Sequence, residues 1–413
     1  MRSILAWERN VLSNGLTVLQ CPRSSSTMAQ LSVAIEYGSN DDSEENAGNA
    51  HFLEHMLVGG SQNRIKLHNE IEKLGGRSNF ETSDEFTFST VNVFPRKIAE
   101  ASKVLSGLLF DSAFAKEKFE LERKVILNEV AEVYDDPRDR VAETLTKCLF
   151  KNHPIKNPVI GSKKTIKQLT LNEIKTAHQN YYVPQRMILI LTGSFTSKDI
   201  ETVLQDFQDR KNQNSASKRN TQTEEKEPKK ETLIKKSGIA QAYLSFGFRT
   251  VPAKDMDTPS LDLIDTILGM GESSRLFVEL REKRALTYDF ECGNASGLDY
   301  GYFSINCAVN VRALNKTKRI ILGELRKLKT RSVTKSELDK SKNLMLGTIF
   351  RQIDSSQGLP RLLAYEEIHF ESENALADYT NKISSISEQD ITETANKYFQ
   401  DKNYATAILT PKK

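Results

Sequence analysis

Two kinds of apolar pattern appear in both halves of the chain. LSVAIEYG, from Leu31, and YLSFGFRT, from Tyr243, have the alternation of strands, and each is followed by residues with helical periodicity. Near the end of each half an apolar run, MILILTG or ATAILTP, follows a helix-like segment. The pattern predicts strands and helices in both halves, which is an α+β organisation.

The segments that end the two halves match at a fixed spacing. TLNEIKTAHQNYY and SEQDITETANKYF each begin with a hydroxyl residue and carry an acidic residue three positions later, which is typical of a capped helix. We therefore expect two duplicated domains, each a mostly antiparallel sheet flanked by helices. Four pairs of similar residues are each 217 positions apart: Thr170 and Ser387, Glu173 and Asp390, Ile174 and Ile391, Tyr181 and Tyr398.

A further helix is predicted in the second half. We expect Thr258 to cap it, Pro259 to occupy its first position and Gly269 to end it. Its apolar stripe comprises Leu261, Ile264 and Leu268.

A polar segment separates the halves. From Asp209 to Thr232 only Ala216 and Pro228 are neither polar nor charged, so burial of this segment cannot offset the entropy lost when it is ordered. A chain of 413 residues is also too long for one core. We predict a first domain over residues 1–208, a linker over 209–232 and a second domain over 233–413.

Charge and cysteine content narrow the functional classes. The 58 basic side chains nearly balance the 55 acidic ones, so electrostatics give no reason to expect nucleic acid or an anionic membrane as a partner. No apolar run is long enough for a membrane span, and the run before Glu8 is too short for a secretory signal, so we expect a cytoplasmic protein. The four scattered cysteines form no CxxC pair, which argues against a thiolate zinc site.

One short motif carries candidate metal chemistry. Residues 51–58 are His-Phe-Leu-Glu-His-Met-Leu-Val, and on a helix His51, Glu54 and His55 fall within an arc of about 100°, opposite the apolar residues. Two imidazoles four residues apart suit one zinc ion, and a carboxylate beside the second is placed to take a proton from water. The order is that of the HxxEH motif. Structural histidines are the alternative interpretation.

A zinc site with an open position needs a third protein ligand. In FELERKVILNEVAEVYDDP, three carboxylates recur at helical spacing, so all could face the histidine helix: Glu122, Glu129 and Glu132. A solvated charged face is the alternative. The valine, isoleucine and leucine residues between them favour an amphipathic helix beside a core.

Three segments, HFLEHM, IEKLGGRSNFETSDEFTF and ERKVILNEVAEVYDDP, together resemble the pitrilysin family of metallopeptidases. The likeness covers nearly the whole chain. The chain is similar to the family's short, two-domain form, such as the mitochondrial processing peptidase beta subunit. The resemblance implies one Zn²⁺ per chain with His51, His55 and Glu129 as ligands. It implies Glu54 as the base and Glu122 as the glutamate that orients the site.

The spacing of the third ligand departs from the family pattern. Seventy-three residues separate His55 from Glu129, slightly fewer than the family usually shows. Glu132 therefore stays open as an alternative ligand.

The same resemblance assigns residues 79–82, Asn-Phe-Glu-Thr, to an edge strand on which a peptide adds as an extra strand. It implies that Asn79 and Phe80 contact the substrate. The family usually has a small residue where Phe80 stands, so either the first specificity pocket differs or the alignment shifts by one residue.

A segment of the second half, GMGESSRLFVELREKRALTYDFE from Gly269, resembles the family's second substrate-binding segment. Arg281 and Tyr288 have its seven-residue spacing, which implies that they bind the peptide and stabilise the oxyanion. In long members of the family this motif and the zinc motif lie in separate halves of a four-domain chain. Because this two-domain chain carries both, we expect a homodimer, or a heterodimer with a related chain, whose partner subunit completes each site.

The function implied is a zinc endopeptidase that hydrolyses peptides or unfolded segments inside the clamshell-like chamber of a dimer. The alternative is a non-catalytic or processing subunit of the same fold, which acts as a scaffold in a heterodimer. Relatives of that kind typically lose the HxxEH motif. This sequence keeps it, so the peptidase is favoured.

Overall fold

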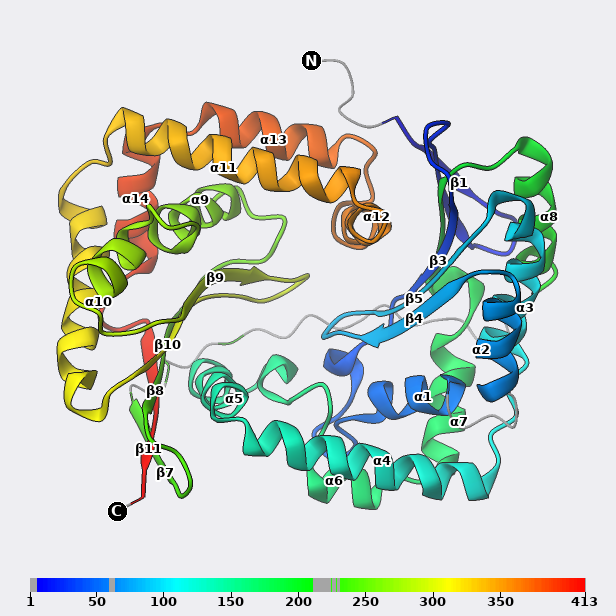
Figure 1. Ribbon diagram of the computed structural model, residues 1–413, viewed down its shortest axis with the longest axis horizontal. Coiled ribbons are helices and arrows are strands. Elements are labelled where there is room, and N and C mark those ends of the chain that lie inside the picture. The colour runs from blue at the N-terminus through cyan, green and yellow to red at the C-terminus, as the bar shows by residue number, and fades with distance from the viewer. Residues whose placement is uncertain (1–5, 59–63, 211–223, 225–227, 229–230, 413) are drawn as a thin grey trace. The chain divides into compact units, whose positions relative to one another are not determined.

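The computed structural model describes residues 6–58, 64–210, 224, 228 and 231–412 (Figure 1). Contacts within the chain divide it into two compact units. Unit 1 comprises Met1–Ala131, Asn157–Asn220 and Arg351–Leu376, and unit 2 comprises Glu132–Lys156, Thr221–Phe350 and Ala377–Lys413. Each unit therefore contains a segment from the other half of the sequence.

Unit 1 is built on a six-stranded sheet in the order β1-β2-β6-β3-β5-β4. Neighbouring strands are antiparallel except β2 and β6, which are parallel. β3 includes the first five residues of LSVAIEYG and β6 the whole of MILILTG, and both strands are buried along their whole length. The strands are β1 Glu8–Val11, β2 Thr17–Pro22, β3 Ala29–Ile35, β4 Arg77–Thr82, β5 Thr87–Val93 and β6 Met187–Gly193.

The helices of unit 1 include one from the second half of the sequence. This helix, α12 (Gly358–Phe370), contributes Leu359 and Leu363 to an apolar cluster with Phe88 and Ile188 of the sheet and the single tryptophan, Trp7. The first-half helices are α1 Asn49–Val58, α2 Arg64–Lys73, α3 Ile98–Phe110, α6 Lys163–Gln168, α7 Leu171–Tyr181 and α8 Ser197–Gln208. Another helix, α4 (Lys116–Asp135), begins in unit 1 and continues into the sequence assigned to unit 2.

Unit 2 repeats this arrangement with five strands in the order β7-β11-β8-β10-β9. β7 and β11 are parallel and the other pairs antiparallel, so these strands correspond in order to β2-β6-β3-β5-β4. The predicted α+β duplication is therefore confirmed. The strands are β7 Glu231–Lys236, β8 Ala242–Arg249, β9 Phe290–Ser296, β10 Gly301–Val309 and β11 Tyr404–Pro411.

Unit 2 in turn includes a helix from the first half. α5 (Pro137–Leu149) packs Leu145 and Leu149 in one apolar cluster with Ala407 of β11. Each sheet therefore packs against a helix from the opposite half of the sequence. The other α-helices are α9 Thr258–Gly269, α10 Leu314–Thr330, α11 Lys335–Asp354, α13 Ala375–Ser385 and α14 Glu388–Tyr398. The end of α11 and the start of α13 lie in the sequence assigned to unit 1.

The predicted caps near the ends of the two halves are confirmed. The Thr170 hydroxyl accepts a hydrogen bond from the Glu173 amide at 3.3 Å, and the Glu173 carboxylate accepts one from the Thr170 amide at 2.7 Å. Ser387 and Asp390 form the same reciprocal pair at 3.3 and 2.7 Å. The repeated sequence signature therefore produces the same helix start, on α7 and on α14.

The start of α9 differs from the prediction. Asp257 is the N-cap, Thr258 is the first helical residue, and the Thr258 hydroxyl donates to the carbonyl of Pro252. The predicted cap was wrong, because the Thr258 hydroxyl bonds to the preceding loop instead of capping a helix amide. The helix ends at Gly269, as predicted, where a Cβ atom would lie 2.2 Å from the Cβ of Cys292 on β9.

Most of the predicted linker lies outside the described residues. α8 ends at Gln208, and β7 begins at Glu231, one residue before the predicted end of the linker. Within the segment, the Glu224 carboxylate accepts hydrogen bonds from the amides of Lys151 and Asn152 at 2.8 and 2.6 Å. The domain boundaries in the sequence stay a prediction.

Two further findings concern the helices and the cysteines of the described residues. None of their helices is both long enough and apolar enough to span a bilayer. All four cysteines are free thiols, and three of them are buried.

The reciprocal cap at Thr170 predicts a measurable loss of stability. Thr170→Ala removes the acceptor for the Glu173 amide and should lower the free energy of unfolding by about 1 kcal/mol. Urea unfolding followed by the fluorescence of Trp7, which packs in unit 1, measures the change. Thr170→Ser keeps the hydroxyl and is the control. Equal losses in both variants would contradict the capping role.

Candidate metal centre

The histidine helix α1 has one apolar and one polar face, as predicted. Phe52, Leu53 and Met56 are fully buried. The side chains of His51 and His55 keep 16% and 15% of their exposure, and the two rings meet edge to face with centroids 4.6 Å apart. The apolar face anchors the helix in the core, while the two imidazole side chains on the other face remain partly exposed.

The start of α1 is held by a residue that the sequence pattern did not indicate. The buried carboxylate of Asp42 accepts hydrogen bonds from the amides of Gly48 and Ala50 at 3.0 and 3.2 Å, and from the Tyr37 hydroxyl at 2.9 Å. Burial raises the pKa of Asp42 to about 7, although these bonds oppose the shift. No capping signature was visible, because Asp42 lies seven residues before the helix begins.

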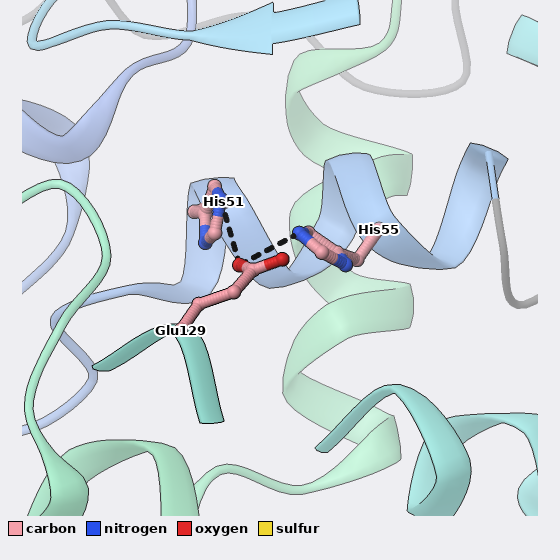
Figure 2. Close-up of side chains that lie close together, drawn as sticks. All are labelled: His51, His55 and Glu129. Atoms are coloured by element: carbon pink, nitrogen blue, oxygen red, sulfur yellow. Dashed lines mark ion pairs between the residues drawn. The ribbon is translucent and has the colours of Figure 1, made fainter. Parts of the chain in front are cut away.

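Glu129 of α4 points at both histidines (Figure 2). Its Oε2 lies 3.4 Å from Nε2 of His55 and 3.9 Å from Nε2 of His51. One ligand atom from each of the three residues lies within 4.8 Å of the others, and no second group of this kind occurs among the described residues. The structure therefore brings together the three predicted ligands.

The donor set fits a zinc ion. Ligand atoms about 2.0–2.1 Å from one zinc at tetrahedral angles lie about 3.4 Å apart, which matches the distance between His55 and Glu129. Burial and the neighbouring His55 lower the pKa of His51 to about 3. His51 is therefore neutral near pH 7, as a metal ligand must be. Two imidazoles and one carboxylate leave a fourth position for water or substrate.

Glu122 orients the second histidine. Its carboxylate is 2% exposed and places Oε2 3.2 Å from Nδ1 of His55, which leaves Nε2 directed at Glu129. Burial alone would lower the pKa of His55, but the bond to Glu122 and the charge of Glu129 raise it. A carboxylate behind a ligating histidine fixes the ring and increases its basicity. This geometry suits the role that the resemblance implies for Glu122.

Glu54 lies beside the histidines, and a strand residue holds it. The Thr82 hydroxyl of β4 donates to Oε2 of Glu54 at 2.9 Å. Burial raises the pKa of Glu54, with Thr82 and His55 acting in the opposite direction. A carboxylate with a raised pKa is a better proton acceptor near neutral pH. The sequence carried no signal for the contact with Thr82, because the two residues are 28 positions apart.

Glu132, the alternative ligand, is not part of this group. Its side chain is exposed, and within the described part of the chain only Glu129 joins the histidines. Three residues along an α-helix turn a side chain by about 60° and move it nearly one turn further along the axis. That displacement directs Glu132 toward solvent.

The predicted substrate strand is an edge strand of its sheet. β4 pairs with β5, where Asn79 lies opposite Thr90 and Phe80 opposite Ser89, and it ends the strand order. Asn79 is exposed and Phe80 is half-buried. Their contact with a substrate stays a prediction.

Arg281 and Tyr288 belong to unit 2 and contact each other. The guanidinium carbon of Arg281 lies 4.5 Å from the centroid of the Tyr288 ring, which is 81% exposed. Between them, Ala285 has a φ of 47°, in the left-handed region that residues other than glycine rarely adopt. Backbone strain beside a half-buried arginine and an exposed tyrosine is typical of functional segments. The role of this pair in substrate binding stays a prediction.

Comparisons with known protein families cover both halves of the chain. Residues 18–163, which contain the HxxEH motif, match the family model described as insulinase (peptidase family M16). Residues 168–345, which contain Arg281 and Tyr288, match the model described as peptidase M16 inactive domain. The second description therefore applies to the part of the chain without the zinc motif.

The similarity to individual proteins extends over nearly the whole chain. The uncharacterized zinc protease YmxG of Bacillus subtilis is 25% identical over 98% of both chains. The probable mitochondrial-processing peptidase subunit beta of Arabidopsis thaliana is 25% identical over 97% of this chain and 77% of its own length. The crystal structure of a protease from Helicobacter pylori has a TM-score of 0.90 at 25% identity, and the match covers 98% of this chain and 100% of that one. The resemblance is thereby confirmed, and the chain belongs to peptidase family M16 in its short, two-domain form.

Proposed function

We propose that this protein is a zinc-dependent endopeptidase. The observation that carries the proposal is the group of His51, His55 and Glu129, whose ligand atoms lie within 4.8 Å of one another. Glu54 is close enough for the charges of His55 and Glu129 to affect its pKa. Three ligands, an open position and an adjacent base are what metal-assisted hydrolysis of a peptide requires.

Each side chain of the group has a distinct task in this proposal. His51, His55 and Glu129 would hold the zinc ion, which when bound supplies Lewis-acid activation of water and polarises the substrate carbonyl. Glu54 accepts the proton of the attacking water and delivers it to the leaving amine nitrogen. The hydrogen bond from Thr82 keeps the Glu54 carboxylate in place during both transfers.

We further propose that peptides or unfolded segments bind along the outer edge of β4 as an added strand, in contact with Asn79 and Phe80. Arg281 and Tyr288 of the partner subunit would supply a cation and a hydroxyl to the developing oxyanion. The working protein is then a homodimer that encloses its substrates, with a related second chain as the alternative partner.

The ligand assignment predicts the zinc content. The purified protein should carry about one zinc per chain. His51→Ala and His55→Ala should abolish zinc binding, and Glu129→Gln should weaken it by more than the roughly 10- to 100-fold that loss of an outer-shell partner costs. Elemental analysis after dialysis measures the effect. Glu132→Gln, the same chemical change one turn away, is the matched control and should keep full zinc. The reverse ranking of the two glutamine variants would move the ligand to Glu132.

Peptide hydrolysis should depend on zinc and on Glu54. Incubation with a mixed peptide library should give internal cleavage products by mass spectrometry, and a chelator should abolish them. Glu54→Gln should keep zinc but lose about 10²- to 10⁴-fold in kcat, because an amide accepts no proton from water. Unchanged turnover in that variant excludes Glu54 as the base. Zinc-loaded wild-type protein that cleaves nothing supports the scaffold function instead.

A site shared between subunits predicts complementation. Glu54→Gln and the double variant Arg281→Ala, Tyr288→Phe should each be nearly inactive, and mixing them should restore activity. In a mixed dimer one site has all its groups and the other carries both defects. Random exchange makes about half of the dimers mixed, so about a quarter of all sites should be intact.

Native mass spectrometry provides the control for that experiment by reporting subunit exchange. Mixed dimers without recovered hydrolysis would rule out the shared site.

A further inference from the structure

The helices α1 and α12 lie on opposite sides of the β4–β5 hairpin (Figure 1). Successive residues of a strand point to opposite faces. On β4, Thr82 donates to Glu54 of α1, whereas Glu81 pairs with Arg361 of α12. All of these residues belong to unit 1. The strand predicted to bind substrate is therefore held between the helix of the zinc motif and a helix from the second half of the sequence.

A buried histidine joins the end of α12 to the turn of this hairpin. Nε2 of His369 lies 2.7 Å from Oε2 of Glu85, and the side chains are only 2% and 6% exposed. Nδ1 of His369 faces the carbonyl oxygen of Tyr365 at 2.9 Å, and the Tyr365 ring stacks on the imidazole with centroids 3.9 Å apart. Because an oxygen faces each nitrogen, the ring is held in one orientation and directed at Glu85.

A second residue of α12 contacts the two strands of the hairpin. Arg361 pairs with Glu81 of β4, and its guanidinium carbon lies 5.8 Å from the centroid of the Phe88 ring on β5. Glu81 and Phe88 lie opposite each other in the register of the hairpin. Arg361 therefore contacts both strands at the same position of the register, at the residue that precedes Thr82.

The two contacts differ in strength. The side chains of Arg361 and Glu81 are 47% and 34% exposed, so solvent screens their attraction. The pair of His369 and Glu85 is almost completely buried, and loss of one partner deprives a buried polar group of this bond. His369 is therefore the stronger of the two anchors.

Unit 2 contains an equivalent pair. His153 follows the end of α5, and its Nε2 lies 3.0 Å from Oδ1 of Asp299, with side chains 1% and 5% exposed. Asp299 lies in the turn between β9 and β10, as Glu85 lies in the turn between β4 and β5. In both units a buried histidine, on or just after the helix contributed by the other half, thus contacts an acidic residue in the turn of the edge hairpin.

We propose that Arg361 and His369 are positioning residues for catalysis. They hold the β4–β5 hairpin against α1, so that Thr82 orients Glu54 and the outer edge of β4 is placed to receive the peptide. The inference rests on the proposed function and extends it, because it makes a helix of the second half part of the catalytic apparatus of unit 1.

The test compares full-length, zinc-loaded wild-type protein with His369→Ala, His369→Gln and Arg361→Ala. Amide hydrogen exchange over residues 77–93 should become about tenfold faster in His369→Ala and less so in Arg361→Ala. The kcat for a cleaved peptide should fall about tenfold in His369→Ala, since Glu54 is no longer held in place, while zinc content stays unchanged. His369→Gln, whose amide can donate to Glu85, should recover part of both losses.

Glu367→Gln is the matched control. Glu367 also lies on α12, but it pairs with Arg9 of β1 at 2.8 Å, at the opposite edge of the sheet. This variant should change neither the exchange of residues 77–93 nor kcat. If His369→Ala fails to fold, His369→Gln and Arg361→Ala carry the same comparison.

Three outcomes distinguish the possibilities. Unchanged exchange in the hairpin overturns the inference whatever the activity. Faster exchange with unchanged kcat also overturns it, because the contact is then only structural. A wild-type protein that hydrolyses no peptide refutes the proposed function and with it the catalytic role of these residues, and the exchange data still decide whether α12 holds the hairpin.

Discussion

The candidate site depends on placing one carboxylate of α4 against two imidazoles of α1. Glu129, which is partly exposed, reaches both His51 and His55, whose imidazoles are largely buried and are held by neighbouring groups. α1 is held by its buried apolar face and by Asp42 at its start, and His55 is held by Glu122. Burial in the same packing lowers the pKa of His51. The packing of α1 therefore determines the lowered pKa of this histidine.

The two halves of the sequence exchange helices because both faces of the sheets have to be covered. β3 and β6 are buried along their whole length, as strands are when both faces of a sheet are covered. The first half supplies helices to its own sheet, and α12 of the second half packs in another apolar cluster on it. α5 does the same for the sheet of unit 2. Neither half of the sequence completes its core without the other.

In the proposed function, this arrangement would connect substrate binding with proton transfer. The edge strand β4 would receive a peptide, and its last residue, Thr82, also donates to Glu54, the proposed base. A displacement of β4 therefore affects the base and the peptide together. Glu81 and Glu85, on β4 and in the turn that follows it, contact α12, so the position of the strand is set from both of its faces.

The sequence by itself determined what depends on local periodicity: the duplicated helices and strands, the caps at Thr170 and Ser387, and the HxxEH face of α1. It left Glu129 and Glu132 as alternatives, because the rotation of α4 against α1 decides between them. Only the tertiary structure decided the exchange of α5 and α12 and the contacts of Thr82 with Glu54 and of His369 with Glu85. Those last two contacts join residues 28 and 284 positions apart. Contacts at such separations have no periodic signature, since they form only when the sheet and its helices pack.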